Sequence, residues 1–188
     1  MRNISRFSML FTVMSASALA GCAYESETAP VSAAAAQPPA VAVATLMDAA
    51  GNNVGEAKLV QQGDGVAVSI SVSGISAGPH GTHIHMTGTC DAPDFKTAGG
   101  HWNPMMTQHG LENPQGHHSG DLPNMDVQAD GTGSLSFIVA GATLRDGDNP
   151  LFDEDGAAIV VHAGPDDMVS DPSGNSGGRI ACGVIRSE

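Results

Sequence analysis

The chain has 188 residues and a formal net charge of −13 at pH 7. Nucleic acid and anionic membrane surfaces repel such an acidic protein, so neither is an expected partner. The helical period of 3.6 residues is nearly absent from its hydrophobic pattern, which argues against a helical fold.

The first 21 residues have the features of a lipoprotein signal peptide. Arg2 and Arg6 give a positive start, and residues 9–20 are apolar but too few for a membrane-spanning helix of about 20 residues. This stretch closes on Leu-Ala-Gly-Cys, which resembles a bacterial lipobox and makes Cys22 the lipidated first residue of the mature chain. The alternative is an ordinary secretory cleavage site beside a stray cysteine. Removal of the two arginines takes the net charge from −13 to −15.

Residues 22–40 are expected to form a flexible tether, because small residues, proline and glutamate dominate and cannot bury a core. The folded domain is expected over residues 41–188, a length typical of one domain. We expect a periplasmic protein whose membrane contact is the lipid on Cys22. Ala23 is not the aspartate of an inner-membrane retention signal, which favours the outer membrane.

Short apolar alternations in the folded part predict β-strands. In residues 66–72, valine or isoleucine at every second position alternates with alanine or serine, the pattern of a half-buried strand. Turn residues such as Gly63 and Gly131 separate such runs. Eight strands are expected, over residues 41–47, 54–61, 66–72, 82–86, 125–128, 134–139, 158–161 and 180–185. Eight short strands with such turns predict an all-β sandwich or barrel.

Two long segments, residues 87–124 and 163–179, are rich in Gly, Pro, Asp and Asn and break the strand pattern. Loops this long in a compact domain are usually functional or disordered. All eight histidines of the chain lie between His80 and His162, and seven of them lie at or before His118. The histidines therefore indicate that the loops are functional.

The spacing of these histidines predicts a metal centre. His83 and His85 stand two apart on an expected strand, so both rings face one side while Ile84 faces the core. Alone, this pair could be two surface histidines. Further candidate ligands follow on the long loop and at the end of a core strand: His101, His109, His118, Asp121 and His162. Imidazole suits copper and zinc, and a carboxylate suits zinc.

Cys90 and Cys182 remain once Cys22 is assigned to the lipobox. An even pair of cysteines in an exported, oxidising setting predicts a disulfide. A bridge that closes so long a loop stabilises a protein by about 2–4 kcal/mol.

Five sequence blocks resemble the copper/zinc superoxide dismutases, in the order in which that family carries them. They are HGTHIH at 80–85, AGGHWNP at 98–104, HSGDL at 118–122, VVHAGPDD at 160–167 and GNSGGRIACGVI at 174–185. The resemblance covers nearly all of residues 41–185. It implies an eight-stranded Greek-key β-barrel or sandwich with two long functional loops. The turn after Asp121 and the loop after His162 are similar to the bacterial branch.

The resemblance also implies roles for the candidate ligands. Copper is held by His83, His85, His101 and His162, and zinc by His101, His109, His118 and Asp121. His101 then bridges the two ions. His117 is the rival of His118, which fits the family's His-x-x-Asp spacing. Asp166 matches an aspartate that accepts hydrogen bonds from one copper and one zinc histidine, and His80 matches a structural histidine. Cys90 and Cys182 match the family's disulfide.

The implied reaction converts two superoxide radicals and two protons into dioxygen and hydrogen peroxide. One copper, which changes oxidation state, and one zinc, which does not, are expected in each subunit. His101 passes a proton towards peroxide in the family's mechanism. Because superoxide is an anion and the chain is acidic, the site must be a local positive well, and Arg179 is the expected guide. An ordinary strand-edge arginine is the alternative. Monomer and homodimer both stay open.

The sequence departs from the family in two places. Thr82 stands where the family usually carries an aromatic residue. Residues 168–173 contain no lysine, whereas many members place charged residues there, so we expect weak long-range steering of superoxide.

Two other functions compete with this interpretation. A non-enzymatic copper or zinc protein on the same fold would lack copper access or the arginine, but Arg179 and all four copper-type histidines are present. A cupin also carries His-x-His on a strand, but a glutamate ligand generally follows closely. Residues 86–89 offer none.

Overall fold

The computed structural model describes residues 40–188, so the predicted signal peptide, Cys22 and nearly all of the tether lie outside the described residues. The described elements are β1 (Val41–Asp48), β2 (Asn53–Gln62), β3 (Gly65–Val72), β4 (Gly78–His80), β5 (Thr82–His85), a 3₁₀ helix η1 (Lys96–Ala98), β6 (Met125–Val127), β7 (Gly133–Ala140), β8 (Ala158–His162), β9 (Arg179–Val184) and β10 (Arg186–Ser187). All eight predicted strands are confirmed, and β4 and β10 are additional. Within this part of the chain no helix is long and apolar enough to span a bilayer.

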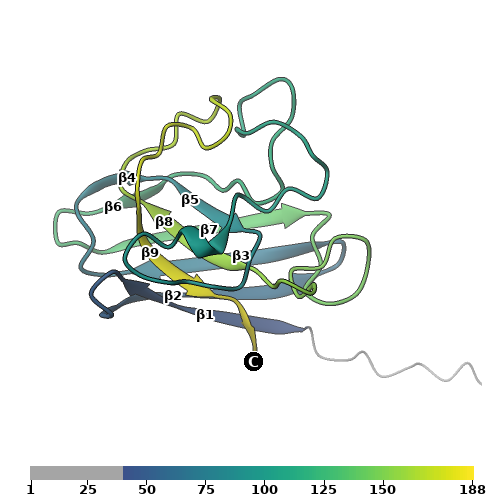
Figure 1. The fold of residues 1–188 in the computed structure, drawn as a ribbon, viewed down its shortest axis with the longest axis horizontal. Helices are drawn as coiled ribbons and strands as arrows, with labels where there is room; N and C mark the ends of the chain where they lie inside the picture. Colours follow the sequence, from purple (N-terminus) through teal and green to yellow (C-terminus); the bar gives the residue numbers. More distant parts are fainter. Residues whose placement is uncertain (1–39) are drawn as a thin grey trace, which may run out of the picture. The chain divides into compact units, whose positions relative to one another are not determined.

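The strands form one antiparallel sheet that curls into a nearly closed barrel (Figure 1). Their order is β4-β6-β7-β3-β2-β1-β9-β8-β5, with β10 added to β1. β4 and β5 lie at opposite ends of this order, yet only Gly81 separates them along the chain. Gly81 N–H donates to Gly164 O at 2.9 Å, and His162 N–H donates to Gly81 O at 2.8 Å. These bonds extend the β5–β8 pairing to Gly81, through which the chain itself links β5 to β4 at the other end of the order. The predicted all-β fold class is confirmed.

Alternate side chains of the strands fill the barrel. β3 buries a valine or isoleucine at every second position and exposes Ser69 and Ser71. Ile84, with 0% of its surface exposed, reaches the same core from β5, as the alternation predicts. Each such buried aliphatic side chain stabilises the fold by about 1.5–3 kcal/mol relative to leaving it in water.

The free edge of β5 is covered by the first long loop. Two isolated antiparallel bridges join strand and loop, His83 with Asp121 and His85 with His101. Ile84 N–H donates to Gly120 O at 2.8 Å. A Cβ atom on Gly120 would overlap the carbonyl oxygen of Ile84, so only glycine permits this close approach. The loop therefore carries two candidate ligands to the strand that carries two others.

The two long loops meet at one side of the barrel (Figure 1). Glu112 N–H donates to Met168 O at 3.0 Å, and the Asn113 side-chain amide donates to Val169 O at 3.2 Å. The loops predicted to be functional thus share one face.

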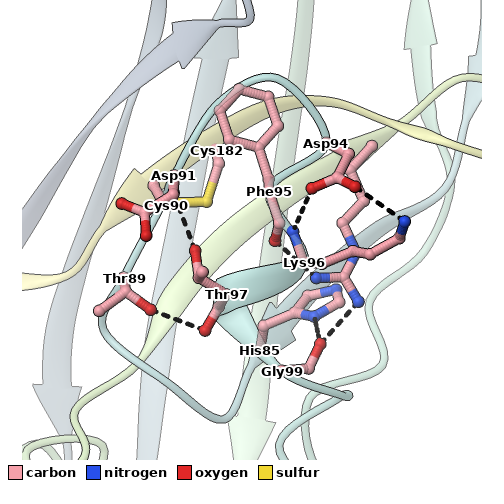
Figure 2. Close-up of a disulfide and its surroundings, with 11 residues drawn as sticks. His85, Thr89, Cys90, Asp91, Asp94, Phe95, Lys96, Thr97, Gly99 and Cys182 are labelled. Atoms are coloured by element: carbon pink, nitrogen blue, oxygen red, sulfur yellow. Dashed lines mark hydrogen bonds and ion pairs between the residues drawn. A yellow bond between two sulfur atoms is a disulfide. The ribbon is translucent and has the colours of Figure 1, made fainter.

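Cys90 and Cys182 form the predicted disulfide, which ties the segment after β5 to β9 (Figure 2). It lies in a small apolar cluster that is separate from the barrel core. The buried members of this cluster are Phe95, Ala98, Ala158, Val160 and Cys182.

Candidate metal centre

Four buried histidines converge beside the first long loop: His83 and His85 from β5, His101 from the loop and His162 from the end of β8. One nitrogen of each ring can be chosen so that all four atoms lie within 4.8 Å of one another. The structure thus brings together the four residues that the sequence predicts as one ligand set.

Each of these rings uses one nitrogen inside the protein and leaves the other without a partner. Three of the internal bonds are donated by His83 Nε2 to Asp166 Oδ2 (2.7 Å), His85 Nδ1 to Gly99 O (3.0 Å) and His162 Nδ1 to Gly177 O (3.2 Å). The unpartnered atoms are His83 Nδ1, His85 Nε2, His101 Nε2 and His162 Nε2. No other buried side-chain nitrogen or oxygen in residues 40–188 lacks a hydrogen-bond partner.

A buried polar atom without a partner costs about 1–3 kcal/mol, so four of them at one place need an explanation. Hydrogen bonds on the far side of each ring fix its tautomer and aim a lone pair outward. Four converging imidazole lone pairs suit a copper or zinc ion. The residues therefore fit a metal ion.

A second set of ligand atoms lies next to the first and shares His101. Asp121 Oδ1 lies 2.8 Å from His101 Nδ1 and 3.0 Å from His109 Nδ1. His118 Nδ1 lies 3.3 Å from His101 Nδ1 and 3.4 Å from Asp121 Oδ1. His101 presents Nδ1 to this set and Nε2 to the first, so one imidazole can serve two ions.

The fourth member of the second set needs a choice between three histidines. His83 also lies within 4.8 Å of this set, but its Nε2 donates to Asp166 and its Nδ1 belongs to the first set. His117 is exposed, and its Nδ1 lies 2.8 Å from the carbonyl oxygen of His118. His118 is only 7% exposed and faces Asp121. Of the two neighbouring histidines, His118 is the one whose ring faces Asp121, and its place as the fourth ligand stays a prediction.

Asp166 joins the two sets from outside. Its Oδ2 accepts from His83 Nε2 at 2.7 Å and its Oδ1 from His109 Nε2 at 3.0 Å. Burial raises the pKa of this carboxyl, but the hydrogen bonds from His109 and His83 bring the pKa well below its usual range. Asn124 holds the backbone of Asp166 through two reciprocal hydrogen bonds of 2.8 Å. Sequence reasoning missed Asn124, since a lone asparagine in a loop carries no signal.

Arg179 lies in the wall of a cavity of about 370 Å³ that His85, His101 and His162 also line. Its Nη1 donates to Phe95 O at 2.7 Å and its Nη2 to Gly99 O at 2.6 Å. Burial lowers the pKa of Arg179, but guanidinium stays charged in proteins. A fixed, half-buried cation beside four histidines suits a small anion. The sequence gives no sign of the two carbonyl groups that hold it.

Comparison with known proteins agrees with this geometry. The family model described as copper/zinc superoxide dismutase (SODC) matches residues 53–185. The chain belongs to the copper/zinc superoxide dismutase family. The prediction of this family is confirmed, and the cupin alternative is wrong.

Relatives of this superoxide dismutase are found among curated proteins and solved structures. "Superoxide dismutase [Cu-Zn] 1" of Aquifex aeolicus is 43% identical over 145 residues, which cover 76% of this chain and 86% of that protein. "Superoxide dismutase [Cu-Zn]" of Caulobacter vibrioides is 41% identical over 139 residues, with coverage of 72% and 80%. The crystal structure of a SOD-like protein from Bacillus subtilis is 39% identical, with a TM-score of 0.72 and coverage of 76% and 96%.

The two ligand sets of this superoxide dismutase differ in their protonation. Burial lowers the pKa of His83 to about 3, of His85 to about 2 and of His162 to about 4. These rings are neutral at pH 7. Burial also opposes the charged form of His109, but hydrogen bonds to Asp121 and Asp166 raise its pKa to about 9. The His109 ring is therefore charged at neutral pH in the metal-free protein.

We expect pH to act mainly on the second set. A metal ion there must displace the His109 proton, so the zinc affinity of the metal-free protein rises about tenfold per pH unit between about pH 6 and 8. His83, His85 and His162 of the first set are neutral above about pH 4 and release no such proton, so these three rings add no such slope to the affinity there. Competition with a chelator of known affinity, repeated across this range, measures both slopes. Equal slopes at the two sets would contradict the assignment of the proton to His109.

Proposed function

We propose that this chain dismutates superoxide to dioxygen and hydrogen peroxide in the periplasm and so protects that compartment. In this proposal copper is held by His83, His85, His101 and His162, and zinc by His101, His109, His118 and Asp121. The observation that carries the proposal is the convergence of four buried, unpartnered nitrogens beside the fixed guanidinium of Arg179. Family membership supports it.

The two donor sets match two different ions. Four imidazoles without a carboxylate suit copper, and three imidazoles with one carboxylate suit zinc. Copper, when bound, supplies one-electron redox chemistry, and zinc supplies fixed positive charge without changing its oxidation state.

The chain's own residues bind the anion and handle the proton. The remaining N–H groups of Arg179, beyond those bonded to Phe95 O and Gly99 O, are free to attract superoxide. His101 lines the cavity, and its Nε2, which has no hydrogen-bond partner, is the atom at which a proton would be held and passed towards peroxide. Asp166 keeps His83 and His109 in the tautomers that present Nδ1 to the ligand sets.

The periplasmic location rests on the sequence of residues 1–40. We propose a lipid on Cys22 that anchors the chain to a bacterial membrane, with the outer membrane favoured. Growth with labelled palmitate should label the full-length protein and leave Cys22→Ser unlabelled. A chain cleaved elsewhere and recovered unlabelled would contradict the anchor.

The test of function uses the full-length protein expressed in a bacterial periplasm. Elemental analysis should find one copper and one zinc per subunit, and the protein should accelerate the decay of superoxide. His162→Ala, which removes one of the four converging nitrogens, should abolish this acceleration. His117→Ala, which removes an exposed histidine of the same loop, is the matched control and should change little. A wild-type protein that holds both metals without effect on superoxide would overturn the enzyme and favour the non-enzymatic metal protein.

Salt should have little effect on the rate. Lys96, the lysine of the segment that holds Arg179, is paired with Asp94 at 2.8 Å, and residues 168–173 contain no lysine. We expect the rate constant to fall less than about threefold between about 10 and 150 mM salt, over which the Debye length shrinks from about 30 to about 8 Å. Val169→Lys, at a position 46% exposed in the second loop, should steepen the dependence. A steep fall in the wild-type protein would contradict weak steering.

A further inference from the structure

The segment between the disulfide and His101 holds Arg179, and the largest side chain that this segment buries against the barrel is the ring of Phe95. We propose that Phe95 is a positioning residue for Arg179: its buried ring fixes the carbonyl oxygen that accepts from the guanidinium. The inference rests on the proposed function, because only in that function does Arg179 attract the substrate anion.

The backbone of Phe95 is in an unusual conformation at the point of contact. Its φ of 52° and ψ of 23° are left-handed, which is uncommon for a residue other than glycine. Such a conformation persists only where the surroundings over-determine it. Phe95 N–H donates to Asp91 O at 3.0 Å, and Phe95 O accepts from Arg179 Nη1 at 2.7 Å. The conformation therefore aims the carbonyl at the guanidinium.

The ring of Phe95 supplies that constraint. It is 1% exposed and belongs to the small apolar cluster of Phe95, Ala98, Ala158, Val160 and Cys182. Figure 2 shows the ring together with Cys182 and the disulfide. Every other residue from 91 to 97 is exposed. Within this stretch only Phe95 is anchored in an apolar core, and β8 and β9 supply the partners.

Ala98 lies in the same cluster, and its carbonyl oxygen accepts from Thr87 N–H at 3.1 Å, so the end of the segment is held. The other interactions do not fix residues 91–97 to the barrel in the same way. Thr89 Oγ1 donates to Thr97 O, and Asp91 N–H donates to Thr97 Oγ1, so these bonds tie the segment to itself. The Lys96–Asp94 pair is 80% and 55% exposed, and such surface pairs contribute little. The disulfide holds Cys90, five residues before Phe95. Apart from Arg179, Phe95 O also accepts from Ala98 N–H at 3.2 Å, so removal of the ring should loosen the carbonyl of residue 95.

The test compares Phe95→Ala and Phe95→Leu with the wild-type holoenzyme at equal copper and zinc content. We expect Phe95→Ala to lower the rate of superoxide decay about three- to tenfold. The affinity for azide, used as a probe anion, should fall by a similar factor. Phe95→Leu keeps an apolar side chain, so its rate and its azide affinity should lie between those of the wild type and Phe95→Ala. Leu59→Ala removes a fully buried side chain of β2 from the main core and serves as the control for lost stability alone.

A second readout reports on Arg179 without any need for activity. Phenylglyoxal modifies accessible arginines, and mass spectrometry of the peptide that carries Arg179 gives its rate of modification. We expect this rate to rise several-fold in Phe95→Ala and to stay at the wild-type value in Leu59→Ala. If Phe95→Ala does not fold, Phe95→Leu serves as the test, and we expect a smaller rise in the rate of Arg179 modification.

Unchanged modification of Arg179 and unchanged azide affinity in a folded Phe95 variant would overturn the positioning role. Equal changes in Leu59→Ala would overturn it as well, because they would reflect stability alone. A wild-type holoenzyme without effect on superoxide would refute the proposed function instead, and the modification rates would still decide whether Phe95 positions Arg179.

Discussion

Replacement of Asp166 by alanine is expected to lower the zinc affinity about 100-fold and to slow superoxide decay with it. The carboxylate accepts one hydrogen bond from His83 and one from His109, so a single change leaves a buried N–H donor in each ligand set. Loss of such a partner typically lowers metal affinity about 10–100-fold. We expect the upper end here because both sets lose their support together.

Asp167→Ala is the matched control for this change. Asp167 is the next residue in the chain, and its carboxylate accepts from Ser170 N–H, Val169 N–H and the Asn175 amide but contacts no histidine. Chelator competition should show a zinc affinity within about threefold of the wild type, as is usual for changes away from the ligand partners. A similar value in Asp166→Ala would mean that the carboxylate does not orient the histidines.

The strands and the ligand residues could be predicted because both depend on side chains. In β3 apolar residues alternate with small ones, and this alternation lets one face of the strand pack in the core. The same period of two therefore predicts the strand from the sequence. The spacing of His83 and His85 likewise placed two rings on one side of β5. β4 (Gly-Pro-His) and β10 (Arg-Ser) were missed since neither carries the alternating apolar side chains that marked the short strand β6 (Met-Asp-Val).

The parts that sequence reasoning missed depend on the backbone. Phe95 O and Gly99 O hold Arg179, but every residue has a carbonyl group, so nothing in the residue types marks these two. The pairing of Gly81 with the end of β8 depends on backbone hydrogen bonds of the same kind. The spacing to Asp121 let sequence reasoning prefer His118 to His117, and in the structure His118 faces Asp121 while His117 is exposed.

Gly174 shows how such a backbone feature controls the metal centre. Its φ is +59°, and it lies in the second long loop directly against the Asp166 carboxylate. A Cβ atom at this position would overlap Asp166 Oδ1 and lie 2.8 Å from His109 Nε2. These two atoms form the hydrogen bond that supports the second ligand set. We therefore expect Gly174→Ala to lower the zinc affinity at least as much as Asp166→Ala, by about 100-fold or more.

Gly63→Ala separates this overlap from the cost of the left-handed backbone. Gly63 has a nearly equal φ of +57°, but nothing lies within 4 Å of a Cβ atom built there. An alanine at either position bears the same conformational penalty, about 1 kcal/mol, because its native φ is unfavourable for a side chain. Only Gly174→Ala displaces the carboxylate, so only this variant should lose zinc while both lose some thermal stability. Equal zinc affinities in the two variants would mean that the second loop yields to the methyl group and that Asp166 keeps its place.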